Sequence, residues 1–358
     1  MEKQKQIRSI SGIKALAFLG VVSAHSGLTG SAIYVSIFFI VSGFLMTYSY
    51  YGRELKTGLK DNLSFAVKKM RMLYPLHIIC LLIIAVSIGI IGKSPALWKY
   101  VGKTFVIDAL LIQSWFPDTK INMSLNGVSW YLSTALFLYY AFPWLLKGIK
   151  KYHSRKQAVL VSAAIFAMMF AAAAAANRLV DDKDAVKWAT YVFPVFRLGD
   201  FAIGANFGYV FLNSKRKLPE KEYTALEILS LILIAADFYF DLNGDHFGLN
   251  SFIGMEHTLM HIIPAVVFIY ICAHDGGKVS AVLGSRPLKV LGDLSAYGFL
   301  THYLFTYLAA PQILRILDRV GLEKGQTVIS FIIILFFTLL TAQIYNKAYH
   351  RIASRVHR

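Results

Sequence analysis

Apolar residues dominate the chain in long runs that short polar segments separate. Runs of about twenty residues recur at roughly 10–28, 31–51, 73–92, 128–146, 158–176, 189–212, 225–241, 255–272, 290–309 and 326–346. A helix of this length crosses the hydrocarbon core of a bilayer. The pattern therefore predicts an all-α, polytopic membrane protein with about ten transmembrane helices, which we treat as one membrane-embedded domain over residues 1–358.

Segment 93–127 departs from this pattern. Its apolar part, Thr104–Phe116, is too short to span a membrane comfortably, and Asp108 and Gln113 interrupt it. Backbone at membrane depth that is not a spanning helix must be covered by protein or lie at the interface. We expect a re-entrant or interfacial segment here.

Composition and charge support a membrane protein. The chain is 56% hydrophobic and only 16% charged, whereas soluble domains are about a quarter charged. The net charge of +17 does not indicate nucleic-acid binding, because the basic residues lie in short segments between apolar runs. With ten spans, 26 of the 37 lysines and arginines fall on the side of the N-terminus, so the positive-inside rule predicts that both termini are cytoplasmic.

The first apolar run carries two polar residues on one face. Lys14 and His25 are eleven residues apart, close to three helical turns, which places them on one stripe roughly 16 Å apart. Charged and titratable groups in lipid are costly and usually functional. An imidazole can accept a proton near neutral pH, although His25 could instead bond a neighbouring helix and Lys14 could be a snorkelling anchor. In the next run, the small Ser42–Gly43 step would admit a second helix at close range.

This arrangement resembles the N-terminus of the acyltransferase 3 family, integral-membrane enzymes that acylate bacterial surface glycans. The family has a basic residue, ten residues and then His in its first helix, followed by an FFxxSGF-like helix. Here Lys14 takes the basic position, where Arg is more usual, and Phe38–Phe44 reads FFIVSGF. Further resemblances follow in order along the chain at Phe65–Tyr74 (a basic loop), Trp130–Pro143, Phe193–Gly208 and Leu291–Phe305.

The resemblance implies transfer of an acyl group, with acetyl expected, from acetyl-CoA at the cytoplasmic face to a hydroxyl of an extracytoplasmic glycan. The protein would then lie in a bacterial cell membrane, in contact with its lipids, with no metal and no nucleic-acid partner. The residues implied are His25 as general base with Arg197 and His302 as further catalytic residues, Lys14, Lys68, Lys69 and Arg71 for acetyl-CoA, and Trp130, Asp200, His257 and His261 for the acceptor.

Several of these residues have a structural alternative. The basic residues of Phe65–Tyr74 also fit the positive-inside pattern or contact with anionic lipid. Trp130 fits an interfacial belt. Arg197 and Asp200, three apart, fit an ion pair, and Gly204 and Gly208 form a GxxxG packing motif.

The roles of four further positions stay open. His257 and His261 have metal-ligand spacing but lack a third convincing ligand, so a wet polar face is expected instead. His302 could bond within the site or hold helices together. Ala135 stands where the family usually has Glu, so any orienting role of that carboxylate must fall to another residue here.

A transporter or flippase for a lipid-linked sugar is the competing function, with these polar groups lining a pathway. Transporters often carry paired inverted repeats with interrupted helices at matched positions. The sequence shows no such symmetry, which favours the enzyme.

Overall fold

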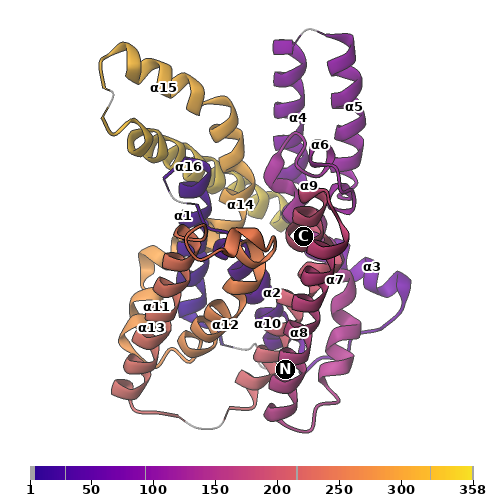
Figure 1. Ribbon diagram of the computed structural model, residues 1–358, viewed down its shortest axis with the longest axis vertical. Helices are drawn as coiled ribbons and strands as arrows, with labels where there is room; N and C mark the ends of the chain where they lie inside the picture. The colour runs from indigo at the N-terminus through magenta and orange to yellow at the C-terminus, as the bar shows by residue number, and fades with distance from the viewer. Residues whose placement is uncertain (1–4, 29, 93, 215–216, 323, 357–358) are drawn as a thin grey trace.

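A computed structural model describes residues 5–28, 30–92, 94–214, 217–322 and 324–356, and within these ranges the chain forms helices and loops without a strand. The helices are α1 (Arg8–His25), α2 (Ile33–Tyr50), α3 (Leu59–Met70), α4 (Tyr74–Gly92), α5 (Pro95–Ala109), α6 (Thr119–Asn122), α7 (Trp130–Ile149), α8 (Arg155–Leu179), α9 (Lys183–Lys187), α10 (Pro194–Leu212), α11 (Glu220–Leu242), α12 (Met260–Cys272), α13 (Lys278–Leu283), α14 (Arg286–Leu308), α15 (Ala310–Arg319) and α16 (Gln326–Val356). Short 3₁₀-helices are η1 (Gln113–Trp115), η2 (Gly127–Ser129) and η4 (Leu249–Ser251), and short π-helices are η3 (Trp188–Val192) and η5 (Met255–Leu259). Figure 1 shows their arrangement.

Each of the ten predicted apolar ranges coincides with a helix. In the described part of the chain, five helices are long and apolar enough to cross a membrane, or six if the bent pair α3–α4 counts as one span. The structure thus confirms an all-α membrane architecture, but it does not confirm a count of about ten spans. Helices such as α1 and α10 bury most of their surface against other helices, so they can carry polar residues that a lipid-exposed span could not.

Helices α1 and α14 pack side by side and run in the same direction (Figure 1). A Cβ added to Gly292 would overlap the Ser11 backbone, and one added to Gly298 would overlap the Phe18 ring. Further along, His25 contacts His302. The stripe of α1 that runs from Lys14 to His25 therefore faces α14 along its length.

Helices α2 and α10 form the other close pair at the centre of the fold. A Cβ on Gly43 would collide with the Phe201 carbonyl of α10, and one on Gly204 would collide with the Ile40 carbonyl of α2. The structure confirms both packing predictions: the Ser42–Gly43 step admits a second backbone, and the GxxxG motif is a helix contact.

The basic stretch Phe65–Tyr74 is not the loop that the resemblance suggested. Its first half is the end of α3, which packs on α7, and the chain then bends by 66° into α4. Lys68 and Lys69 are consecutive residues in the last turn of α3, so their side chains leave the helix about 100° apart and face different surroundings.

Segment 93–127 begins with α5, which stands beside α4 at the upper right of Figure 1. The stretch Thr104–Phe116 is not one continuous segment, because α5 ends at Ala109, Leu111 adopts a left-handed φ of 55°, and η1 follows. Asp108 and Gln113 do not face solvent, since both are buried and bond to Ser124 and Ser129.

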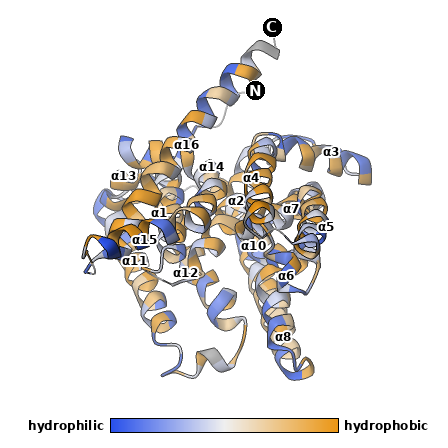
Figure 2. Ribbon diagram, turned by 90° about the horizontal axis from the view of Figure 1, so that it is seen from above, coloured by the Kyte–Doolittle hydropathy of each residue, from blue (hydrophilic) through white to orange (hydrophobic). Residues whose placement is uncertain are grey.

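Hydrophobic residues, orange in Figure 2, occur along most of the helices. Exposed large apolar side chains are frequent on α4, α8, α11 and α16. The C-terminal end of α16, which projects from the body in Figure 2, carries polar residues instead. This distribution is typical of a protein whose flanks contact hydrocarbon.

Candidate active site

His25 and His302 form a hydrogen-bonded pair between α1 and α14. His25 Nδ1 lies 2.8 Å from His302 Nε2, and the two rings stack with centroids 5.0 Å apart. His25 is the exposed member at the end of α1, whereas His302 is fully buried. Tyr303 places its ring edge-on to His25 at 6.2 Å. The pair thus joins a solvent-accessible imidazole to one inside the protein.

Lys14 lines a cavity of about 350 Å³ among α1, α2, α3, α7 and α14. We call it the Lys14 cavity; its lining is Lys14, Phe38, Val41, Ser42, Leu45, Met46, Ser49, Tyr50, Lys69, Met72, Leu73, Tyr131, Leu132, Tyr139, Gly292, Asp293, Ser295, Ala296 and Phe299. Two lysines and one carboxylate give it a net positive charge. Hydroxyls of Ser42 and Tyr139, 3.2 Å apart, add a polar patch.

Aromatic rings lie between the Lys14 cavity and the histidine pair. Phe38, Tyr131 and Phe299 line the cavity and contact one another, with ring centroids 5.1 to 6.3 Å apart. Phe299 also lies 5.8 Å from the His302 ring. The cavity and His302 are therefore neighbours along one stripe of α14, separated by about one helical turn.

The structure divides the three basic residues near α3 between two cavities. Lys69 lines the Lys14 cavity and lies over the Tyr50 ring at 4.4 Å. Lys68 and Arg71 are exposed and line a separate cavity of about 650 Å³ with apolar walls that include Leu110 and Leu136. Lys14 and Lys69 therefore share a site, and Lys68 and Arg71 flank it.

Arg197 is fully buried and lies in a cluster of its own. It pairs with Asp200 at 2.9 Å and donates to the Thr258 hydroxyl at 2.7 Å and to Ser36 at 3.2 Å. Its guanidinium also lies over the Phe39 ring at 4.8 Å. These contacts join α10, α2 and η5, and none of them is with His25 or His302. The ion pair that the i, i+3 spacing suggested is present.

His261 and His257 lie near the Arg197 cluster but differ in surroundings. His261 is buried, with Nδ1 2.8 Å from Asp237 and Nε2 2.7 Å from the Glu256 carbonyl. The Asp237 carboxylate and the Glu256 carbonyl are both hydrogen-bond acceptors. Each ring nitrogen of His261 therefore has a protein partner already. His257 is partly exposed and contacts the Glu256 carboxylate at 3.1 Å.

Trp130 does not line either polar cavity. It is buried among Phe39, Tyr131 and Tyr191, with ring centroids 5.0 to 6.4 Å apart. Ala135, where the family usually has Glu, is buried one turn further along α7 in an apolar cluster with Leu132 and Leu300. Neither position brings a charged group to the histidine pair.

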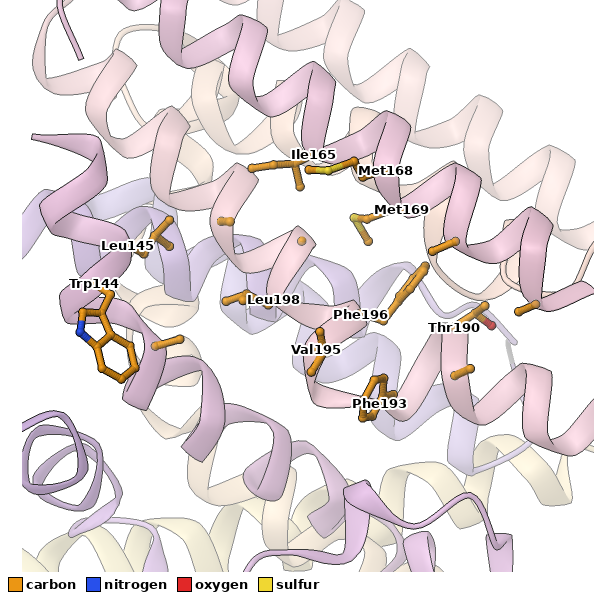
Figure 3. A pocket seen from close by; sticks show the side chains of 16 residues that line it. Trp144, Leu145, Ile165, Met168, Met169, Thr190, Phe193, Val195, Phe196 and Leu198 are labelled. Atoms are coloured by element: carbon orange, nitrogen blue, oxygen red, sulfur yellow. The ribbon is translucent and has the colours of Figure 1, made fainter. Parts of the chain in front are cut away.

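A larger cavity, of about 750 Å³, opens among α7, α8 and α10 (Figure 3). Side chains such as Trp144, Met168, Met169 and Phe196 point into it, and Thr190 is its one hydroxyl-bearing residue. It offers no group that could hold a proton or a phosphate. Its size alone therefore does not make it a reaction site.

Sequence reasoning missed Asp293, Tyr131 and Tyr139, which line the Lys14 cavity, and Tyr303 beside His25. Asp293 could have been noticed, since it lies nine residues before His302 on the same apolar run. The three tyrosines carried no such signal, because tyrosines in apolar helices are common and only the packing of α7 and α14 on their neighbours selects these.

Known proteins are similar to this chain over most of its length. A sequence model of the family described as acyltransferase domain matches residues 7–347. Acyltransferase MdmB from Streptomyces mycarofaciens is 25% identical over 80% of this chain and 70% of its own length. Among solved structures, none matches the chain.

Two further relatives carry a more specific name. The putative peptidoglycan O-acetyltransferase YrhL of Bacillus subtilis (strain 168) is 23% identical over 87% of this chain, and the peptidoglycan O-acetyltransferase OatA of Listeria monocytogenes is 22% identical over 86%. The matched region covers 50% of each of these relatives, so this chain spans about half of their length.

Proposed function

Because the chain belongs to the acyltransferase 3 family, it is an acyltransferase, and we propose that it moves an acyl group, acetyl in the first instance, from acetyl-CoA to a hydroxyl of an extracytoplasmic glycan. The names of the peptidoglycan O-acetyltransferase relatives support O-acetylation and a glycan acceptor. The observation that carries the proposal is the placement of an exposed histidine and a cationic cavity on one stripe between α1 and α14.

The Lys14 cavity is the proposed site of the acyl donor. At about 350 Å³ it lies near the lower end of the range for small-molecule sites. It would therefore hold the acylated arm of coenzyme A, with the phosphates at its lysines and the nucleoside outside. Lys14 and Lys69 supply positive charge at the cavity, and Lys68 and Arg71 supply it beside the cavity. Cations in this arrangement attract and bind phosphates.

His25 is the proposed general base. Its Nε2 takes the proton of the acceptor hydroxyl while the hydroxyl oxygen attacks the thioester carbonyl carbon. The new C–O bond forms, the C–S bond breaks, and the coenzyme A thiolate leaves and takes up the proton that His25 holds. For this step the acyl group must pass the Phe38, Tyr131 and Phe299 rings, which separate the Lys14 cavity from the histidine pair.

The remaining predicted residues are proposed to support the acceptor side. His257 is partly exposed and could contact the acceptor directly. Arg197, Asp200, His261 and Trp130 are buried, so we assign them to holding α2, α7, α10, α11 and η5 in place behind that surface. Arg197 would then influence catalysis through packing, and not by contact with the reacting atoms.

In this proposal all ten apolar helices span a bacterial cell membrane, with both termini in the cytoplasm. Lys14 then lies toward the cytoplasm, where acetyl-CoA is made, and His25 toward the outside, where the glycan lies. The stripe between α1 and α14 would connect the two faces.

The test uses purified protein in proteoliposomes that hold acetyl-labelled acetyl-CoA, with glycan acceptor outside. We expect labelled glycan to accumulate with the wild type and not with His25→Ala, whose loss should be about 10²- to 10⁴-fold. Glycan movement across the bilayer without acetyl-CoA would instead show a transporter and would overturn the proposal.

A further inference from the structure

We propose that His302 is a positioning residue that holds the proton of His25 on Nδ1 and so leaves His25 Nε2 as the lone pair that accepts the proton of the acceptor. This inference rests on the proposed function, because it assigns a cause to the basicity of one atom of His25. It is carried by the hydrogen bonds that both ring nitrogens of His302 make and by the burial of this ring.

The proton of His302 must lie on its own Nδ1. That nitrogen is 2.7 Å from the Phe299 carbonyl oxygen and 3.3 Å from the Gly298 carbonyl oxygen. Carbonyl oxygens only accept hydrogen bonds, so His302 Nδ1 must donate. A neutral imidazole carries one N–H, and His302 is fully buried with no carboxylate in contact among the described residues, so burial favours its neutral form. Its Nε2 is therefore an acceptor.

The tautomer of His25 follows from that of His302. His302 Nε2 lies 2.8 Å from His25 Nδ1, and a lone pair on one side requires an N–H on the other. His25 Nδ1 is then the donor, and His25 Nε2 keeps the lone pair. Because His25 is exposed while His302 is not, the basic atom belongs to the ring that an acceptor can reach.

This arrangement serves a base in two ways. It selects the reactive tautomer, a role that an aspartate performs in serine-protease triads, where the wrong tautomer costs about 10⁴-fold in rate. It also gives the imidazolium that forms on His25 an acceptor for its Nδ1–H, namely the lone pair of His302 Nε2. In this chain a neutral histidine, His302, takes the position beside the base that the aspartate takes in those triads.

Positioning by a neutral partner predicts a specific pH behaviour. Within the part of the chain that the structure describes, the titratable side chains in contact with His25 are His302 and Tyr303, both on α14. Neither carries a negative charge near neutral pH. A carboxylate at position 302 would favour the charged form of His25 and so require a higher pH for the base to be free.

The experiment compares wild type with His302→Gln, His302→Leu and His302→Glu in the proteoliposome transfer assay. Gln offers an acceptor oxygen that does not titrate, so we expect kcat within about 10-fold of wild type. Leu offers none, so kcat should fall by about 10²-fold or more, with an unchanged KM for acetyl-CoA. Glu should move the acidic limb of the pH–rate profile upward by about 1 to 3 pH units.

Thr301→Val is the matched control. Thr301 is also fully buried on α14, and its hydroxyl bonds within its own helix, to the Tyr297 and Gly298 carbonyls.

If His302→Leu merely unfolds the protein, then KM, detergent-melting temperature and pH profile should change together, and His302→Gln should fail in the same way. That outcome, or full activity in His302→Leu, would overturn the positioning role, whereas an inactive wild type would overturn the proposed function itself.

Discussion

Lys14 stands where the resemblance described above leads one to expect Arg, and its surroundings make its role measurable. It is half-buried and lines the same cavity as Lys69 and Asp293. If its task is to attract a phosphorylated acyl donor, charge matters more than shape. Arginine is always charged and reaches further than lysine, so it should serve in its place.

We therefore expect Lys14→Arg to keep activity, Lys14→Ala to raise the apparent KM for acetyl-CoA, and Lys14→Glu to raise it further by repulsion. The measurement is transfer rate against acetyl-CoA concentration in matched proteoliposomes. An unchanged KM in both Lys14→Ala and Lys14→Glu would leave Lys14 as a helix-end anchor.

Arg197 offers a test of packing against direct catalysis. Arg197→Met would leave Asp200 buried without its 2.9 Å partner, which typically costs about 3–5 kcal/mol. The double variant Arg197→Met with Asp200→Leu removes both charges, and such replacements are often neutral. We expect thermal unfolding in detergent to show a large loss in the single variant and recovery in the double variant.

Activity of the double variant then distinguishes the two roles of Arg197. If Arg197 only joins α10 to α2 and η5, the stable double variant should transfer acetyl groups at a rate near that of wild type. A stable but inactive double variant would show that Arg197 contacts the substrate, contrary to the supporting role assigned above.

Among elements, the α2–α10 contact depends on glycines whose replacement has a predictable cost. Gly43→Ala would place a Cβ against the Phe201 carbonyl, and overpacking of this kind typically destabilises by about 1–3 kcal/mol. Gly148→Ala is the matched control, since its added Cβ has no neighbour within 4 Å among the described residues apart from its adjoining residues and helix backbone, and alanine is the better helix former. Melting temperatures that fall equally in both variants would contradict this account of the contact.

At the scale of elements, the sequence could predict the features that follow from the period of a single helix. The face shared by Lys14 and His25, the Ser42–Gly43 step and the GxxxG contact all follow from spacing along one helix, and the structure has each of them. The division of Lys68 and Arg71 from Lys69 could not be predicted, because it depends on the rotation of α3 against α7 and on the bend into α4.

Contacts between distant segments could not be predicted from the sequence either, because they too depend on how helices pack against one another. His25 and His302 are 277 residues apart, and nothing in local spacing indicates that α1 and α14 lie side by side. Likewise, the spacing of His257 and His261 predicts that they share a face. Only the packing of α11 shows that Asp237 is hydrogen-bonded to His261.

For the whole molecule, the arrangement with ten spans makes a labelling prediction. Lys60→Cys and Lys217→Cys should react with impermeant thiol reagents only after the membrane is opened, and His246→Cys should react in intact cells. All three positions are exposed, while the native Cys80 and Cys272 are buried and should give little background. Reversed labelling would contradict the orientation and the placement of His25 outside.

The central claim is that one stripe between α1 and α14 carries an acyl donor at Lys14 and a base at His25. The most direct test measures both activities in one variant, His25→Ala, by binding of acetyl-CoA and by transfer of labelled acetyl to glycan. The account predicts wild-type affinity for acetyl-CoA with transfer lowered by about 10²- to 10⁴-fold. Transfer at the wild-type rate in His25→Ala would contradict it.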